Sequence, residues 1–114
     1  MSKLYSISIY EFKELLTDAT IAHEDSNDPI PELFKDSLSK VENCLKTPFQ
    51  NVFDTELYPT VYDKAAILMY LFIKNHPLAN GNKRMAFITM SFFLYKNGID
   101  FNIGNDEGYE FTKN

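Results

Sequence analysis

Apolar residues recur at helical spacing along the chain, and the pattern predicts several helices. Residues 8–24 form an amphipathic stretch, and Ser8 followed by Glu11 is a capping-box sequence at its start. Residues 31–46 have a similar apolar face and begin with Pro31, which suits a first helical turn. The apolar positions are Ile9, Phe12, Leu16 and Ala19 in the first stretch and Phe34, Leu38, Val41 and Leu45 in the second.

Two further predicted helices, over residues 60–75 and 83–97, are apolar on nearly every side. A helix of that kind is normally enclosed by other elements, so we expect this pair at the centre of the fold. Thr60 with Asp63 three positions later marks the start of the first helix. Gly98 marks the end of the second, because glycine commonly follows the last turn of a helix.

The remaining segments give weaker patterns. Residues 48–57 alternate imperfectly between apolar and polar positions and have no helical face, so we predict a short hairpin rather than an irregular loop. Residues 99–103 are predicted to be extended, and Asn105 resembles the cap of a fifth helix. That helix would reach the chain end almost as it starts. We therefore expect a single all-α domain over residues 1–114, with a C-terminal truncation left open.

Composition excludes several classes of protein. With 45% hydrophobic and 24% charged residues, the chain has enough apolar side chains for a core and is not a disordered tail. The longest apolar run, residues 65–73, is too short to span a bilayer. A single cysteine, Cys44, excludes internal disulfides and a multi-cysteine zinc site. Since the N-terminus carries no export signal, we expect a cytoplasmic protein that does not act at membranes.

Charge is distributed unevenly along the chain. The net charge of −5 argues against direct nucleic-acid binding, which favours a basic surface. However, residues 64–99 contain no Asp or Glu, and Arg84, the only arginine of the chain, lies among them. The planar guanidinium of arginine can bind a phosphate through two N–H donors at once, whereas the lysine ammonium acts as a point charge. We therefore predict an anion site in this segment, whose cationic residues are Lys64, Lys74, Lys83, Arg84 and Lys96.

The loop between the two central helices carries the strongest candidate chemistry. It opens directly onto a helix N-terminus, where unpaired N–H groups and the helix dipole favour an anion. Gly81 permits a backbone with positive φ, and Asn82 can donate an amide to a bound phosphate. At the other end of the loop, His76 is suited to general-base work near neutral pH. An anion cradle beside a base suits phosphoryl or nucleotidyl transfer.

The residues from His76 to Arg84 read His-Pro-Leu-Ala-Asn-Gly-Asn-Lys-Arg. This segment resembles the signature of the Fic/Doc superfamily, which is usually His-x-Phe-x-Asp/Glu-Gly/Ala-Asn-Gly/Lys-Arg. The lysine after the second asparagine resembles the death-on-curing (Doc) toxin branch rather than typical Fic enzymes. The flanking segments are also similar, so the resemblance covers roughly residues 30–112.

The resemblance implies a fold and a role for each motif residue. The fold would be a compact helical bundle with a short β-hairpin flap, which positions a segment of the target protein by strand addition. His76 would remove the proton of the target hydroxyl, and Gly81 with Asn82 would form an anion hole. Lys83 and Arg84 would hold the phosphates of the nucleotide. The flap would comprise Phe49, Gln50, Asn51, Val52 and Phe53.

The resemblance to Doc toxins also implies an activity. The chain would transfer the γ-phosphate of ATP to a threonine or serine hydroxyl of a target protein such as elongation factor Tu. ATP and Mg²⁺ would be its cofactors, and a small antitoxin would be its partner. Asn80 stands where the family usually has an acidic Mg²⁺ ligand, and a neutral amide holds this ion more weakly. Two alternatives stay open: a Fic-type AMP transferase, and, because of Asn80, an inactive Fic-fold module that binds a nucleotide or a partner.

Overall fold

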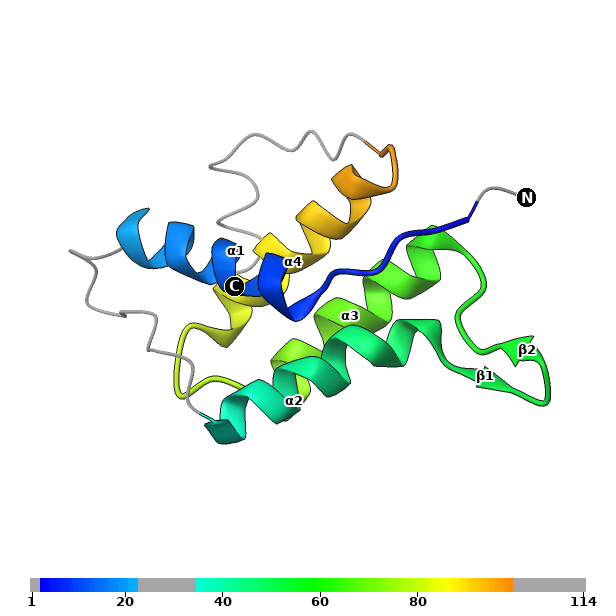
Figure 1. Cartoon of the computed structure of the whole chain (residues 1–114), viewed down its shortest axis with the longest axis horizontal. Helices are drawn as coiled ribbons and strands as arrows, with labels where there is room; N and C mark the ends of the chain where they lie inside the picture. The colour runs from blue at the N-terminus through cyan, green and yellow to red at the C-terminus, as the bar shows by residue number, and fades with distance from the viewer. Residues whose placement is uncertain (1–2, 23–34, 100–114) are drawn as a thin grey trace.

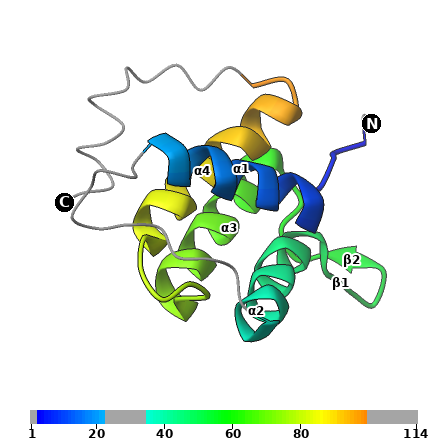
Figure 2. The same ribbon diagram turned by 60° about the vertical axis from the view of Figure 1, so that its left-hand side comes forward.

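Two helices joined by a short loop, α3 (Val61–Asn75) and α4 (Asn82–Lys96), form an antiparallel pair at the centre of the molecule (Figures 1 and 2). The computed structural model describes residues 3–22 and 35–99. Helix α1 packs on α4, and α2 lies beside α3 and leads into a 3₁₀ turn, η1, and a hairpin. The elements are α1 (Ile9–Ala22), α2 (Lys35–Lys46), η1 (Thr47–Phe49), β1 (Asn51–Val52), β2 (Thr55–Glu56), α3 (Val61–Asn75) and α4 (Asn82–Lys96).

Side-chain caps determine where α1 and α3 begin, as the sequence predicts. At α1 the Ser8 N–H donates to Glu11 Oε1 at 2.9 Å, and the Glu11 N–H donates to Ser8 Oγ at 3.1 Å. At α3 the residues Thr60 and Asp63 make the same reciprocal pair at 3.0 and 3.3 Å. Each box satisfies N–H groups that a helix start otherwise leaves without a partner. The predicted stop of α4 is also confirmed, because Gly98 follows it with a φ of 85°.

Aromatic rings lie at the centre of the core. Phe12 of α1 stacks on Phe72 of α3 with 5.4 Å between the ring centroids. Phe49 of η1 packs edge-on against Phe93 of α4, with 6.1 Å between the ring centroids. Removing such a ring from water contributes roughly 1.5–3 kcal/mol, so these contacts fix the helices against one another. Among residues 3–22 and 35–99, the helical core with one small hairpin confirms the predicted all-α fold class.

Cys44 of α2 is part of this core. Burial raises the pKa of its thiol to about 11, although a hydrogen bond with Asn75 acts in the opposite direction. The thiolate is the reactive form of cysteine, so this side chain is chemically inert at neutral pH. It packs as a small apolar group.

Helices α3 and α4 lie at the centre of the fold, as predicted, but other elements do not cover their whole surface. Tyr62, Ala66 and Tyr70 follow one another at four-residue intervals on α3, and all three are exposed. On α4, Tyr95 is 72% exposed. Tyrosine contributes to an apolar sequence pattern, yet its hydroxyl group allows the ring to lie at the surface. The pattern could not distinguish such a face from a buried one.

The segment before α1 is tied to the last turn of α4. The Tyr5 N–H donates to Asn97 Oδ1 at 2.6 Å, and Asn97 Nδ2 donates to the Tyr5 carbonyl at 3.0 Å. Lys96 Nζ lies 2.6 Å from Glu11 Oε1. Burial acts to raise the pKa of Glu11, but hydrogen bonds from Lys96 and Ser8 outweigh it and hold this pKa below its ordinary value. The charge of Lys96 is therefore engaged far from the loop between α3 and α4.

Several predicted features lie outside the described residues. They are the beginning of the second predicted helix, most of the extended segment that starts at Ile99, and the fifth helix after Asn105. Within residues 3–22 and 35–99, no helix has the length and apolar character needed to cross a bilayer.

Candidate functional site

Helix α4 begins without a side-chain cap, in contrast to α1 and α3. Its N-cap residue, Gly81, has φ 74° and ψ 14°, and the Gly81 carbonyl accepts the Met85 N–H at 2.9 Å. Glycine adopts this left-handed conformation readily, so the chain can turn abruptly from the loop into the helix. Because no capping side chain competes for the first-turn N–H groups, the positive end of the helix dipole is open to an anion.

His76 forms the other end of the loop. It is the C-cap residue of α3, with φ 45° and ψ 59°, and it is exposed. This left-handed conformation costs a residue with a Cβ ~1–2 kcal/mol, and such strain is concentrated at functional sites. The next two residues, Pro77 and Leu78, are buried, so packing of the loop into the core holds His76 in place.

Asn82 connects the two ends of the loop. The residue is only 6% exposed. Its Oδ1 accepts the Leu78 N–H at 2.9 Å, and its Nδ2 donates to the Leu78 carbonyl at 2.8 Å. Nδ2 also lies 3.3 Å from Nδ1 of His76. The amide predicted to bind phosphate is therefore engaged inside the loop. Asn82 can therefore contact an anion only through its backbone N–H.

Only part of the predicted basic segment lies near this loop. Lys83 is exposed and Arg84 is half-buried in the first turn of α4, and Lys74 is exposed in the last turn of α3. Lys64 and Lys96 belong to the opposite ends of the two helices, where carbonyl and carboxylate oxygens bind them. The candidate anion site is thus smaller than the segment without acidic residues.

Asn80, the predicted metal ligand, is exposed in the loop. Within the part of the chain that the structure describes, no three His, Cys, Asp or Glu side chains gather as a metal site would require. Mg²⁺ prefers oxygen ligands and commonly takes most of them from water and substrate phosphates. The loop therefore offers an exposed amide oxygen from Asn80 rather than a preformed cage of carboxylates.

The predicted flap forms a hairpin, but the structure places it away from the loop. Phe53 and Asp54 make the two-residue turn between β1 and β2, with φ 52° and 64°, whereas Phe49 belongs to η1 and Gln50 follows it. The 15 residues of α3 separate the hairpin from His76, and at 1.5 Å per residue they span about 22 Å. Figures 1 and 2 show the hairpin projecting beyond one end of the helical pair, with the loop at the other end.

Lys64 holds the base of the hairpin, a role that sequence reasoning missed. Its side chain is 1% exposed, and its Nζ donates to the carbonyls of Pro48 at 2.9 Å and Tyr58 at 2.6 Å, one on each side of the hairpin. Nζ also lies 3.2 Å from Glu56 Oε1 and 4.7 Å from the centre of the Phe49 ring. The hairpin is thus anchored to α3 by a buried cation.

One signal in the sequence could have revealed this role. Lys64 shares a helix face with Leu68 and Phe72, at four-residue spacing, and both of these are core residues. A lysine in such a position must find oxygen partners, because an unpaired buried charge is costly.

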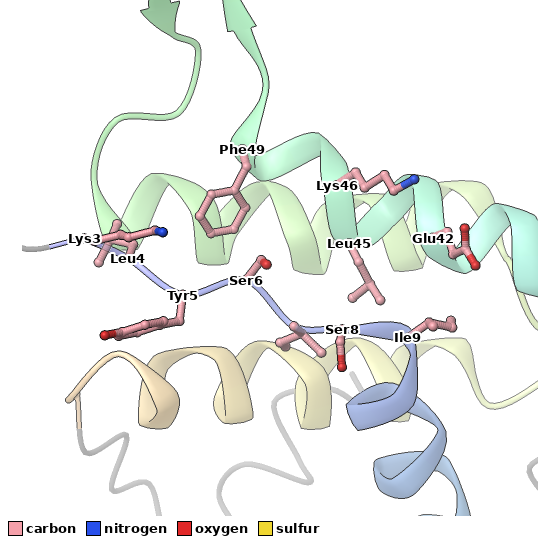
Figure 3. Close-up of a pocket in the computed structure, with 11 residues that line it drawn as sticks. Lys3, Leu4, Tyr5, Ser6, Ser8, Ile9, Glu42, Leu45, Lys46 and Phe49 are labelled. Atoms are coloured by element: carbon pink, nitrogen blue, oxygen red, sulfur yellow. The ribbon is translucent and has the colours of Figure 1, made fainter.

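A cavity of about 630 Å³ lies elsewhere, between the segment before α1 and the junction of α2 with η1 (Figure 3). Leu45 and Phe49 point toward this segment from α2 and η1. Ile7 and Ile9 also line the cavity. No residue of the loop between α3 and α4 lines the cavity. It is therefore separate from the candidate site.

The loop end of the helical pair combines three features: an α4 N-terminus without a side-chain cap, cationic side chains, and an exposed imidazole. The first two can bind a phosphate group, and the third can exchange a proton beside it. Donors fixed before the reaction stabilise charge that develops during group transfer. The arrangement therefore suits the transfer of a phosphate or nucleotidyl group.

The chain is similar to a known protein family over a region that includes this loop. The family model described as "Fic/DOC family" matches residues 6–94, which include the whole loop. "Toxin Doc" of Mycolicibacterium smegmatis is 38% identical over 71 residues, which are 59% of this chain and 55% of the relative. The chain thus spans about half the length of that relative. No solved structure matches this chain. Since the family match covers well over half of its residues, the chain belongs to the Fic/DOC family.

Proposed function

We propose that this protein is a toxin of the Doc type that transfers the γ-phosphate of ATP to a threonine or serine hydroxyl of a target protein. The observation that carries the proposal is the loop that joins exposed His76 to an α4 N-terminus without a side-chain cap. The name of the relative, "Toxin Doc", supports the same class of protein. Elongation factor Tu is the target that we propose to test first, and a small antitoxin is the proposed partner.

In the proposed reaction, the nucleotide phosphates lie at the N-terminus of α4. Backbone N–H groups of the first turn donate to phosphate oxygens, and Lys83 and Arg84 add positive charge. Mg²⁺ bound with ATP supplies charge neutralisation on the phosphates. The target hydroxyl oxygen attacks the γ-phosphorus, its proton passes to His76, and the bond to the β–γ bridging oxygen breaks to release ADP.

The position of Lys83 favours phosphate transfer over AMP transfer. Relatives that transfer AMP usually have glycine after the motif asparagine, whereas this chain places an exposed cation there, in the first turn of α4. A lysine at this point adds bulk and charge within reach of the phosphates, which favours presentation of the γ-phosphate toward His76.

The test uses ATP labelled at either the γ or the α position, incubated with elongation factor Tu and the full chain. We expect the γ label, and not the α label, to enter the target, with a mass gain of one phosphate per modified hydroxyl. Lys83→Gly should lower this incorporation, whereas Lys74→Gly, which changes the other exposed lysine near the loop, should lower it less. Entry of the α label would establish the AMP transferase instead. Bound ATP without entry of either label would favour the inactive module.

Asn80→Asp is expected to increase transfer and to lower the Mg²⁺ concentration required for half-maximal rate by roughly 30-fold. The reason is charge: a unit charge about 4 Å from a divalent cation is worth ~2 kcal/mol even in a water-like dielectric. The measurement is a Mg²⁺ titration of γ-phosphate incorporation with both proteins. An unaltered Mg²⁺ dependence would show that residue 80 does not contact the metal.

A further inference from the structure

The orientation of the Asn82 amide is determined by the backbone of the loop. Oδ1 accepts the Leu78 N–H at 2.9 Å, and Nδ2 donates to the Leu78 carbonyl at 2.8 Å. The reverse orientation would set a donor against the N–H and an acceptor against the carbonyl. Asn82 is 6% exposed, so water could not relieve either clash at low cost. The NH₂ group of Asn82 is therefore the group that faces His76.

We propose that Asn82 is a positioning residue that fixes the tautomer of His76. Nδ2 of Asn82 lies 3.3 Å from Nδ1 of His76, and an amide NH₂ can only donate. Nδ1 must then accept, so the proton of the neutral ring resides on Nε2. The left-handed backbone of His76, with buried Pro77 and Leu78 directly after it, holds the ring in this contact.

The tautomer determines what His76 presents to a ligand. With Nδ1 facing the buried Asn82 amide, the other ring nitrogen carries an N–H and donates to an anion. For Nε2 to take the proton of a target hydroxyl, it must first lose its own proton to solvent while Nδ1 gains one. Nδ1–H would then face a second donor, so the Asn82 contact must break. This consequence rests on the proposed function, whereas the tautomer itself concerns the chain without any ligand.

Nuclear magnetic resonance of the ¹⁵N-labelled full chain tests the proposal. The chain has two histidines, His23 and His76, so their ring signals can be assigned with His76→Gln. In alkaline buffer, in which histidine rings are neutral, we expect a protonated Nε2 and an unprotonated Nδ1 for His76. The ratio of Nε2–H to Nδ1–H should be about fivefold higher than in the same chain unfolded in urea, because one net hydrogen bond is worth ~1 kcal/mol.

Asn82→Asp is the decisive variant. A carboxylate can still accept the Leu78 N–H, and its charge suits the N-terminus of α4. Its second oxygen faces the Leu78 carbonyl, however, so we expect a less stable protein and check by amide spectra that it folds. Because a carboxylate only accepts, Nδ1 should become protonated and the tautomer ratio should fall by at least about fivefold. The matched control is Asn80→Asp, which adds the same charge at an exposed position of the same loop and should leave the ratio nearly unchanged.

Three results would overturn the proposal. They are a predominantly Nδ1–H ring in the unsubstituted protein, a native ratio equal to that in urea, and equal shifts in Asn82→Asp and Asn80→Asp. The first two need no variant, so the proposal stays testable if Asn82→Asp does not fold. No nucleotide is present in these experiments. If the phosphate-transfer test failed, the tautomer measurements would be unaffected. If the tautomer proposal failed, the phosphate-transfer test would be equally unaffected.

Discussion

His76→Ala is expected to reduce phosphate transfer by roughly 10²-fold or more, the usual cost of losing a general base. ATP affinity should change little, because the proposed phosphate contacts come from the first turn of α4 at the other end of the loop. The measurements are single-turnover transfer of the γ label and calorimetric titration of the protein with Mg²⁺-ATP. Loss of affinity and turnover in equal measure would indicate that His76 is structural rather than catalytic.

His76→Gly separates catalysis from folding in this experiment. The backbone of His76 is left-handed, with φ 45° and ψ 59°, a conformation that glycine adopts with ~1–2 kcal/mol less strain than other residues. Glycine also has greater freedom in the unfolded chain, which offsets part of that gain. We therefore expect His76→Gly to be at least as stable as His76→Ala in thermal unfolding, and equally inactive. If His76→Gly were both more stable and more active than His76→Ala, the proposed catalytic role of His76 would be contradicted.

The helical class and the site segment could be predicted from the sequence because their signals are local. Apolar periodicity marks each helix, and reciprocal caps such as Thr60 with Asp63 mark where helices begin. The segment from His76 to Arg84 is likewise continuous in sequence, so its chemistry and its place between two helices could both be inferred. The family match over residues 6–94 confirms the resemblance on which the interpretation of this segment depends.

What the sequence could not provide were the partners of individual polar groups. The Asn82 amide binds Leu78 and His76 inside the loop rather than facing a phosphate, which depends on how the turn folds back. Lys64 belongs to a run without acidic residues, yet its charge lies in the core and is bound by Pro48 and Tyr58. Formal charge along a chain says nothing of burial, and burial decides whether a cation is available to a ligand.

The second large effect is expected from Lys64→Met, which should lower the free energy of unfolding by ~3 kcal/mol. The substitution keeps most of the length of the side chain but removes the donor shared by the carbonyls of Pro48 and Tyr58. Removing one partner from a buried charged network typically lowers the free energy of unfolding by ~3–5 kcal/mol. The lower end applies here because the Glu56 side chain is 47% exposed and water can solvate its carboxylate. For a domain of this size, the midpoint of thermal unfolding should fall by roughly 15 °C.

Lys74→Met on the same helix is the matched control. Lys74 is exposed, and its Nζ lies 5.4 Å from the centre of the Tyr70 ring, so its removal should change the free energy of unfolding by about 0.5 kcal/mol or less. Urea titrations of both variants give the comparison, and amide spectra locate the change. Signals of the hairpin should shift in Lys64→Met, while those of the loop around His76 should stay in place, because about 22 Å of α3 separates the two. If the two variants were equally stable, the contacts of Lys64 would contribute no net stability, and the hairpin would be held by apolar packing around Phe49 alone.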